Sequence, residues 1–327
     1  MLDGRREEAT IALIVRNRQL IMVRLGKLAA TLVALLASSA TNACGPNGVA
    51  VQILGSGGPS VVDQRASASN IVWVDGRARV LVDAGGGAFL RFAESSAKIE
   101  DLSLIAITHL HADHVADLPA LVKSGYFSDR TRALPISGPS GGNDFPSLSE
   151  FLNAEFSEPR GAFRYLSGSL DGSDGFFKLE PRQVPANTKK PFEVFRDADL
   201  TVTAVSVPHG PVPALAYRVD VRGMHLVFSG DQNGSADSFW QLATNADLLI
   251  MAHAVPEDAD PVARKLHATP SAIGFGAGQS HVKHMILTHL MARSLRTLDA
   301  NIALIRKSYT GKLDVATDLA CYPVPVP

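Results

Sequence analysis

The stretch Thr108-His109-Leu110-His111-Ala112-Asp113-His114 decides the fold of this chain, and it follows the apolar run 102–107. That run is typical of a buried strand. Three imidazoles and one carboxylate then fall within six residues. These groups would repel one another once protonated, whereas a divalent metal holds them together, and neutral imidazole with carboxylate suits zinc. In a tight turn, His109 and His111 can point to one side while Asp113 and His114 point to another, which predicts two adjacent metals.

The composition is that of an ordinary globular protein. The chain has 327 residues, of which 46% are hydrophobic and 19% are charged, and this length is ample for one large core. The formal net charge of −1 gives no global field that would favour nucleic acid or an anionic membrane. We therefore expect no nucleic acid partner, with a homo-oligomer possible.

The N-terminal segment is typical of a secretory signal peptide. Residues 22–27 are basic, residues 28–36 are an apolar run too short to span a bilayer, and residues 37–43 are small and polar. An N-terminal amphipathic helix is the alternative. We predict that residues 1–43 are an extension and signal peptide. Translation begins at either Met1 or Met22. The mature chain is then periplasmic or secreted, without a transmembrane span.

Two cysteines, Cys44 and Cys321, lie near the ends of the predicted mature chain. Export permits a disulfide, and chain ends are often close together, so a terminal disulfide is one expectation. A lipid anchor at Cys44 is the other, although Thr41 stands where a lipidation site usually has Leu. Neither cysteine has the spacing of a metal ligand.

Strand and turn signals continue on both sides of the motif. The segment 49–54 is strand-like and leads into 55–59, Gly-Ser-Gly-Gly-Pro, which predicts a tight turn because Pro59 stands where a phosphate-binding loop would open a helix. Asp75-Gly76 predicts a hairpin between 69–74 and 78–83. Apolar residues at helical spacing predict a helix over 115–126.

A Gly-x-Ser-x-Gly match at 138–142 is predicted to be a turn. A nucleophile elbow needs a helix directly after the serine, whereas Pro146 is predicted to open the next helix here.

Four further strands end in a titratable group, as does the strand before His109. The predicted strands are 200–207, 225–228, 246–251 and 284–287, and they lead to His209, Asp231, His253 and His289. Active sites in open α/β sheets form beyond the carboxyl ends of the strands, so these side chains are predicted to meet. Thr269-Pro270 begins a helix, with proline in its first turn, and His267 directly precedes it. The other histidines, His225, His281 and His284, are predicted to be surface or core residues.

Residues 127–200 hold nine of the fourteen phenylalanines. Two interpretations remain open for them. They form the local core of an inserted subdomain, or some of them wall a pocket for an apolar or aryl group. We predict one domain over 44–327 that contains this aromatic-rich insert.

The ordered motifs resemble the metallo-β-lactamase superfamily over roughly residues 49–320. The resemblance implies an α/β fold, a four-layer αββα sandwich, and a hydrolase that uses two Zn²⁺, with Mn²⁺ or Fe²⁺ as alternatives. A hydroxide bridging the two metals would be the nucleophile, since zinc lowers the pKa of bound water to about 7. By the same resemblance, the first metal takes His109, His111 and His209, the second takes Asp113, His114 and His289, and Asp231 bridges both.

The segments 252–254 and 265–270 resemble the ribonuclease Z and arylsulfatase branch of that superfamily. The branch implies that His267 acts as an acid or electrostatic stabiliser and that Asp113 shuttles a proton. It implies that Asp83 supports the metal loop by hydrogen bonds and that His253 is a supporting residue. The chain departs from ribonuclease Z at 253–256, where His-Ala-Val-Pro replaces the usual His-Glu-Ala-Thr.

Three substrate classes follow from this branch. The main expectation is a secreted arylsulfatase acting on a small-molecule anionic ester, a sulfate ester with an aryl leaving group, because segment 117–127 resembles those enzymes. The alternative is a phosphodiesterase, including cyclic-nucleotide forms. A ribonuclease Z-type tRNA 3′ endonuclease is disfavoured, since the short connection from His209 to Asp231 leaves no room for the tRNA-gripping arm of ribonuclease Z. A non-catalytic binding module is disfavoured because every expected ligand is present.

Overall fold

The computed structural model describes residues 44–60, 64–142 and 144–325. The predicted extension and signal peptide over 1–43 lies outside the described residues. Among those that are described, no helix is long and apolar enough to cross a membrane.

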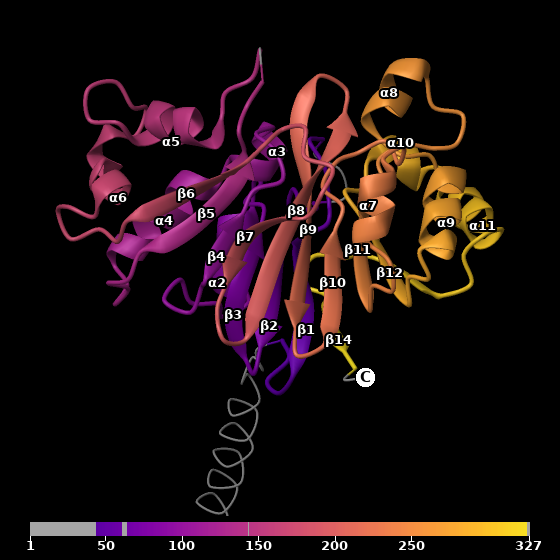
Figure 1. Cartoon of the computed structure of the whole chain (residues 1–327), viewed down its shortest axis with the longest axis horizontal. Helices are drawn as coiled ribbons and strands as arrows, with labels where there is room; N and C mark the ends of the chain where they lie inside the picture. Colours follow the sequence, from indigo (N-terminus) through magenta and orange to yellow (C-terminus); the bar gives the residue numbers. More distant parts are fainter. Residues whose placement is uncertain (1–43, 61–63, 143, 326–327) are drawn as a thin grey trace, which may run out of the picture. The chain divides into compact units, whose positions relative to one another are not determined.

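Two seven-stranded mixed sheets form the centre of the fold (Figure 1). The first sheet has, in spatial order, β14 (Cys321–Val324), β1 (Val49–Gly55), β2 (Ser69–Val74), β3 (Arg77–Val82), β4 (Leu104–Ala106), β5 (Leu134–Pro139) and β6 (Leu179–Val184). The second has β13 (Lys312–Val315), β12 (His284–Thr288), β11 (Leu248–Ala252), β10 (Met224–Phe228), β9 (Val212–Val221), β8 (Leu200–His209) and β7 (Phe192–Arg196). Strands β3 to β6 run parallel in the first sheet, and β10 to β13 run parallel in the second.

Helices cover the outer face of each sheet (Figure 1). Beside the first sheet lie α2 (Ala88–Glu94), α3 (Ala112–Val115), α4 (Leu118–Tyr126), α5 (Leu148–Phe156), the 3₁₀ turn η1 (Arg164–Leu166) and α6 (Gly168–Asp171). Beside the second lie α7 (Asp237–Leu242), α8 (Pro261–Leu266), α9 (Pro270–Gln279), α10 (Ala292–Leu295) and α11 (Leu298–Arg306).

Strand β1 shows why the layers stack in this way. Its side chains alternate between two faces, as strand geometry requires. Val49, Val51 and Ile53 pack in the core between the two sheets, whereas Ala50 and Leu54 pack in the core beneath the helices of the first sheet. A third core joins the second sheet to α7, α9 and α11. The predicted four-layer αββα sandwich is confirmed.

The helix predicted over 115–126 is two helices. Helix α3 ends at Val115 and α4 begins at Leu118. A continuous helix would need an amide N–H at position 119 to bond the Val115 carbonyl, and Pro119 has none. The helix predicted to open at Pro146 instead begins at Leu148, because Ser147 caps it by accepting a hydrogen bond from the Glu150 amide at 3.2 Å.

The aromatic-rich section 127–200 contributes to a core that it shares with the first sheet. Phe156, Phe176 and Phe177 are buried in that core, so these three residues are core residues, as in the first interpretation, but the core is continuous with the sheet and not local to a separate subdomain. Phe127, by contrast, is 77% exposed.

A disulfide joins Cys44 to Cys321, with a Cα–Cα distance of 5.6 Å. Cys321 begins β14, which pairs antiparallel with β1 at the edge of the first sheet. Of the two expectations for Cys44, the structure therefore has the disulfide.

Candidate metal centre

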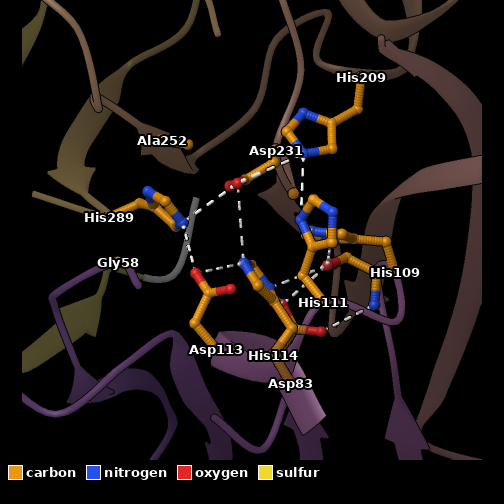
Figure 2. A network of polar contacts seen from close by, with 12 residues as sticks. Gly58, Asp83, His109, His111, Asp113, His114, His209, Asp231, Ala252 and His289 are labelled. Atoms are coloured by element: carbon orange, nitrogen blue, oxygen red, sulfur yellow. Dashed lines mark hydrogen bonds and ion pairs between the residues drawn. The ribbon is translucent and has the colours of Figure 1, made fainter. Parts of the chain in front are cut away.

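The centre lies where strands from both sheets end (Figure 2). Strand β4 of the first sheet leads into the loop and short helix that carry the motif from His109 to His114. In the second sheet, β8 ends at His209, β10 leads to Asp231, and β12 leads to His289. A hydrogen bond from the Leu215 amide to the Thr108 carbonyl, at 2.9 Å, joins β9 to the start of the motif. The two sheets therefore each supply part of one cluster.

All seven ligands implied by the resemblance come together. Their donor atoms form three overlapping groups, within each of which the atoms lie no more than 4.8 Å apart; the groups are His109/His111/His209, His109/His114/Asp231 and Asp113/His114/His289. A fourth group within the same distance joins His267 to His209 and Asp231. Asp231 reaches both sides, since its Oδ2 lies 3.9 Å from Nε2 of His209 and 3.1 Å from Nε2 of His289. Two adjacent groups with one shared carboxylate suit two ions.

Protein contacts on their outer nitrogens turn two of the imidazoles toward the cluster. Nδ1 of His114 contacts Oδ2 of Asp83 at 2.8 Å, and Nδ1 of His209 contacts the Leu266 carbonyl at 2.8 Å. Asp83 is itself held, because the Thr108 amide and hydroxyl donate to its two oxygens at 2.7 and 2.9 Å. Such contacts fix the tautomer and orientation of a metal-binding histidine.

Several buried nitrogen and oxygen atoms that could bind a metal in the cluster have no hydrogen-bond partner among the described residues. They include Nε2 of His114 and Oδ1 of Asp231, and both side chains are almost fully buried. Leaving buried polar atoms unpaired is costly. Nitrogen and carboxylate donors in this arrangement fit divalent ions, so the residues present fit a dinuclear centre.

The cluster has a strong internal field. Burial would raise the pKa of Asp231, but the charges of His289 and His114 outweigh it and hold that pKa well below the usual range. Burial would lower the pKa of His289, but the carboxylates of Asp231 and Asp113 outweigh it and raise that pKa to about 10. The same carboxylates that favour a proton on His289 would favour a divalent cation in its place.

His267 lies at the edge of the cluster, directly after α8. Its Nδ1 is 3.9 Å from Oδ2 of Asp231 and has no hydrogen-bond partner among the described residues. Burial lowers the pKa of His267 to about 3, because the attraction of Asp231 is too weak to offset it. The imidazole is therefore neutral at pH 7, with an N–H available to a substrate oxygen.

His253 does not join the donor groups. Its Nε2 accepts a hydrogen bond from Nδ2 of Asn301 at 3.2 Å, and its backbone amide donates to the Thr288 carbonyl at 2.8 Å. Outside the cluster, His225 pairs with Asp220 and His284 pairs with Asp314.

Three residues at the centre were not predicted from the sequence. The Thr108 hydroxyl bonds Asp83, Gly58 lies against the His289 ring, and Asp318 fixes the loop that carries Gly58. The predicted turn over 55–59 drew attention to the segment that contains Gly58, whereas Asp318 lies in no motif and had no sequence signal.

The family model for the beta-lactamase superfamily domain matches residues 78–290. This chain belongs to the metallo-β-lactamase superfamily. Among its curated relatives in that superfamily, "Ribonuclease Z" of Mycobacterium bovis strain BCG is 26% identical over 289 residues, covering 82% of this chain and 96% of the relative. "Ribonuclease Z" of Enterococcus faecalis is 28% identical over 260 residues, covering 69% and 79%.

Solved structures of other proteins share the fold. Human tRNase Z, short form, superposes with a TM-score of 0.64 at 22% identity, covering 84% of this chain and 99% of that one. The metallo-β-lactamase fold protein YhfI from Bacillus subtilis gives a TM-score of 0.63 at 19% identity, covering 84% and 100%. Family, curated relatives and donor cluster together make this chain a metal-dependent hydrolase with a dinuclear site.

Two expectations are corrected by these relatives. The expected arylsulfatase activity is wrong, because the curated relatives are ribonucleases Z. Sulfate and phosphate esters both present tetrahedral anions to the same ligands, so the motif could not separate them. The expectation of a small ester without a nucleic acid partner is wrong for the same reason. A net charge of −1 averages over the whole chain and does not describe the field at a two-cation site.

Proposed function

We propose that this protein hydrolyses phosphodiester bonds in RNA. The observation that carries the proposal is the position of Asp231, whose Oδ2 lies 3.9 Å from Nε2 of His209 in one donor group and 3.1 Å from Nε2 of His289 in the other, because two adjacent cations suit in-line displacement at a phosphate. The ribonuclease Z relatives, matched over most of their length, support RNA as the substrate.

The ligand assignment is part of the proposal. His109, His111 and His209 would hold one ion, Asp113, His114 and His289 the other, and Asp231 both. Five imidazoles and two carboxylates favour zinc, and manganese or iron would accept the same set. When bound, two such ions would polarise the phosphate and make water acidic enough to react at neutral pH.

Asp113 and His267 would handle the proton and the developing charge. Oδ2 of Asp113 lies 3.1 Å from Nε2 of His289, and the carboxylate stays ionised because the contacts with His289 and His114 lower its pKa despite burial. It can therefore accept a proton from the attacking water. The neutral His267 would donate a hydrogen bond to an oxygen of the phosphate or of the leaving group as the P–O bond breaks, and Asp113 would pass the proton taken from water to the leaving oxygen.

The test uses the purified protein loaded with zinc, a 3′-extended tRNA precursor, and bis-p-nitrophenyl phosphate. We expect cleavage of both, abolished by a chelator and restored by metal. Asp231→Ala should lose the second equivalent of metal and about 1,000-fold in rate. Neither substrate reacting, while two metals are bound per chain, would rule out the proposal.

We also propose that the mature chain works in an oxidising compartment, exported by the signal segment expected over 1–43. The Cys44–Cys321 disulfide supports this, because such bonds persist mainly outside the cytosol. Cell fractionation with thiol labelling tests it. Unmodified thiols on a cytosolic protein would contradict it.

A further inference from the structure

A cavity of about 500 Å³ lies beside the metal centre and shares His209 with it. Its walls come from residues 186–189 between β6 and β7, the tip of the β8–β9 hairpin, Gly142, and Ser235, Ala236 and Ser238 at the start of α7. We propose that this cavity binds a nucleoside of single-stranded RNA next to the scissile phosphate, with Lys189 contacting the RNA backbone. This inference rests on the proposed function and specifies its substrate.

The charge of the lining suits an anionic ligand. Among the described residues that line the cavity, none is an aspartate or glutamate, and the ionisable ones are Lys189 and His209. Pairing is common elsewhere on the surface, where Lys283, for example, bonds Asp247 at 2.7 Å. Lys189 has no acidic partner among the described residues, so its ammonium is available to a phosphate.

Hydrogen-bonding capacity is also available in the cavity. The side chains of Asn187 and Ser238 line it and have no hydrogen-bond partner within the described part of the chain. Pro208, Val212 and Pro213 add apolar surface. Apolar walls with a few free polar groups, in a volume of several hundred Å³, are typical of sites for small organic groups. A nucleoside matches such a site, because it has an apolar base face as well as polar base edges and sugar hydroxyls.

The wall that carries Asn187 and Lys189 is held in place. The Ser206 amide of β8 donates to the Thr188 carbonyl at 2.9 Å, and the Ser206 hydroxyl donates to the Ala186 carbonyl. The Ala186 amide donates to the Ser140 hydroxyl at 3.1 Å. A wall fixed before binding loses little entropy when the ligand arrives.

The position of His209 relates the cavity to the reaction. Its Nε2 faces the cluster, 3.4 Å from Nδ1 of His111 and 3.9 Å from Oδ2 of Asp231. The same residue and Gly210 form part of the cavity wall. An RNA strand whose scissile phosphate lies at the donor cluster would thus place an adjoining nucleoside in the cavity. The substrate class is a short single-stranded RNA segment recognised beside the scissile bond.

The kinetic test compares two substrates on Lys189→Ala. One is a single-stranded hexaribonucleotide that reaches the cavity, and the other is bis-p-nitrophenyl phosphate, which has no nucleoside. We expect kcat/KM for the hexaribonucleotide to fall about tenfold more than that for the small diester, mainly through KM, because a charge-assisted contact is lost. Lys190→Ala, at the adjacent lysine outside the cavity lining, is the matched control and should keep the wild-type ratio.

A second readout does not depend on turnover. A hexaribonucleotide containing 4-thiouridine is photo-crosslinked to the metal-free protein, and the modified peptides are located by mass spectrometry. We expect crosslinks within 186–189 or 235–238, reduced in Lys189→Ala.

The outcomes separate this inference from the proposed function. Suppose that the hexaribonucleotide is hydrolysed, that Lys189→Ala keeps the wild-type ratio of kcat/KM for the two substrates, and that the crosslinks lie elsewhere. This result would rule out RNA binding in the cavity and would leave the proposed function unaffected. Crosslinks in the cavity without hydrolysis of either substrate would support RNA binding in the cavity but rule out the proposed hydrolase function.

Discussion

At the residue scale, two side chains of the centre sit on strained backbone. Asp83 and His289 have φ angles of 61° and 54°, in the left-handed region that non-glycine residues seldom adopt. Each directly follows a strand, and the turn aims its side chain into the cluster. Strain of this kind persists where surrounding contacts over-determine it, and for Asp83 those contacts include the two hydrogen bonds from Thr108 and one from its own amide to the Ala106 carbonyl.

Asp83→Asn should weaken metal binding. The substitution keeps the shape but removes the charge that faces Nδ1 of His114, so that imidazole becomes a poorer and less well oriented ligand. We expect metal affinity to fall about 10- to 100-fold, measured by competition with a chromogenic chelator. Asp117→Asn is the control, because the Asp117 carboxylate accepts a hydrogen bond from the Phe89 amide and from no other group among the described residues, so the substitution should leave affinity unchanged. Equal affinities for wild type and Asp83→Asn would contradict this role.

His253 should make the protein sensitive to acid. Burial lowers its pKa to about 4 from 6.5, so between these values the unfolded chain binds more protons than the folded one. Stability is then retained above pH 6.5 and is lost as the pH falls toward 4, by roughly 3 kcal/mol. In urea unfolding of the metal-free protein, His253→Gln should flatten this dependence, whereas the exposed His281→Asn should not. An identical pH slope in His253→Gln would count against this assignment.

At the element scale, the C-terminal segment fixes a loop that reaches the metal centre. Oδ1 of Asp318 accepts hydrogen bonds from the Ser56 amide and hydroxyl at 3.0 and 2.7 Å, and its Oδ2 accepts one from the Ala66 amide at 2.7 Å. The Ser56 carbonyl in turn accepts the Leu290 amide at 2.9 Å. The loop after β1 is thereby held against the residue that follows His289.

Gly58→Ala should disturb the second metal position. A Cβ at position 58 would lie 2.6 Å from Cε1 of His289, so the ring must move from its place in the cluster (Figure 2). We expect about one metal per chain at concentrations that give two in the wild type, measured by mass spectrometry under native conditions. Gly86→Ala meets nothing closer than 3.9 Å and should retain both. Full occupancy in Gly58→Ala would show that the ring adapts.

Local patterns predicted most of the elements but not the contacts between distant ones. The motif 108–114 and the strand ends at His209, Asp231 and His289 carried their own signals, and the structure brings them together. The turn 55–59 was predicted as a turn only, because its contact with His289 joins positions more than two hundred residues apart. Asp318 had no local signal at all. The predicted substrate was wrong because the metal-binding residues indicate the metal and do not distinguish a sulfate ester from a phosphate ester.

At the scale of the whole described domain, the centre exists only where two similar sheets meet. Each sheet has a parallel group and an antiparallel group in its strand order, and they pack through the shared core that contains Val51 and Leu226. The motif loop comes from one sheet, and His209, Asp231 and His289 come from the other. Geometry at the metals therefore depends on the packing between the sheets.

The Cys44–Cys321 disulfide should contribute strongly to the stability of that domain. It closes a loop with a sequence separation of 277 residues, so it restricts the unfolded chain over nearly its whole described length. We expect Cys44→Ser/Cys321→Ser to lose about 2–5 kcal/mol of unfolding free energy, measured by urea denaturation of the zinc-loaded protein. Reductant should bring the wild type to the stability of the double variant and leave that variant unchanged. If reduced wild type and double variant instead unfold at the urea concentration of the oxidised protein, β14 is held on β1 by its hydrogen bonds and packing alone.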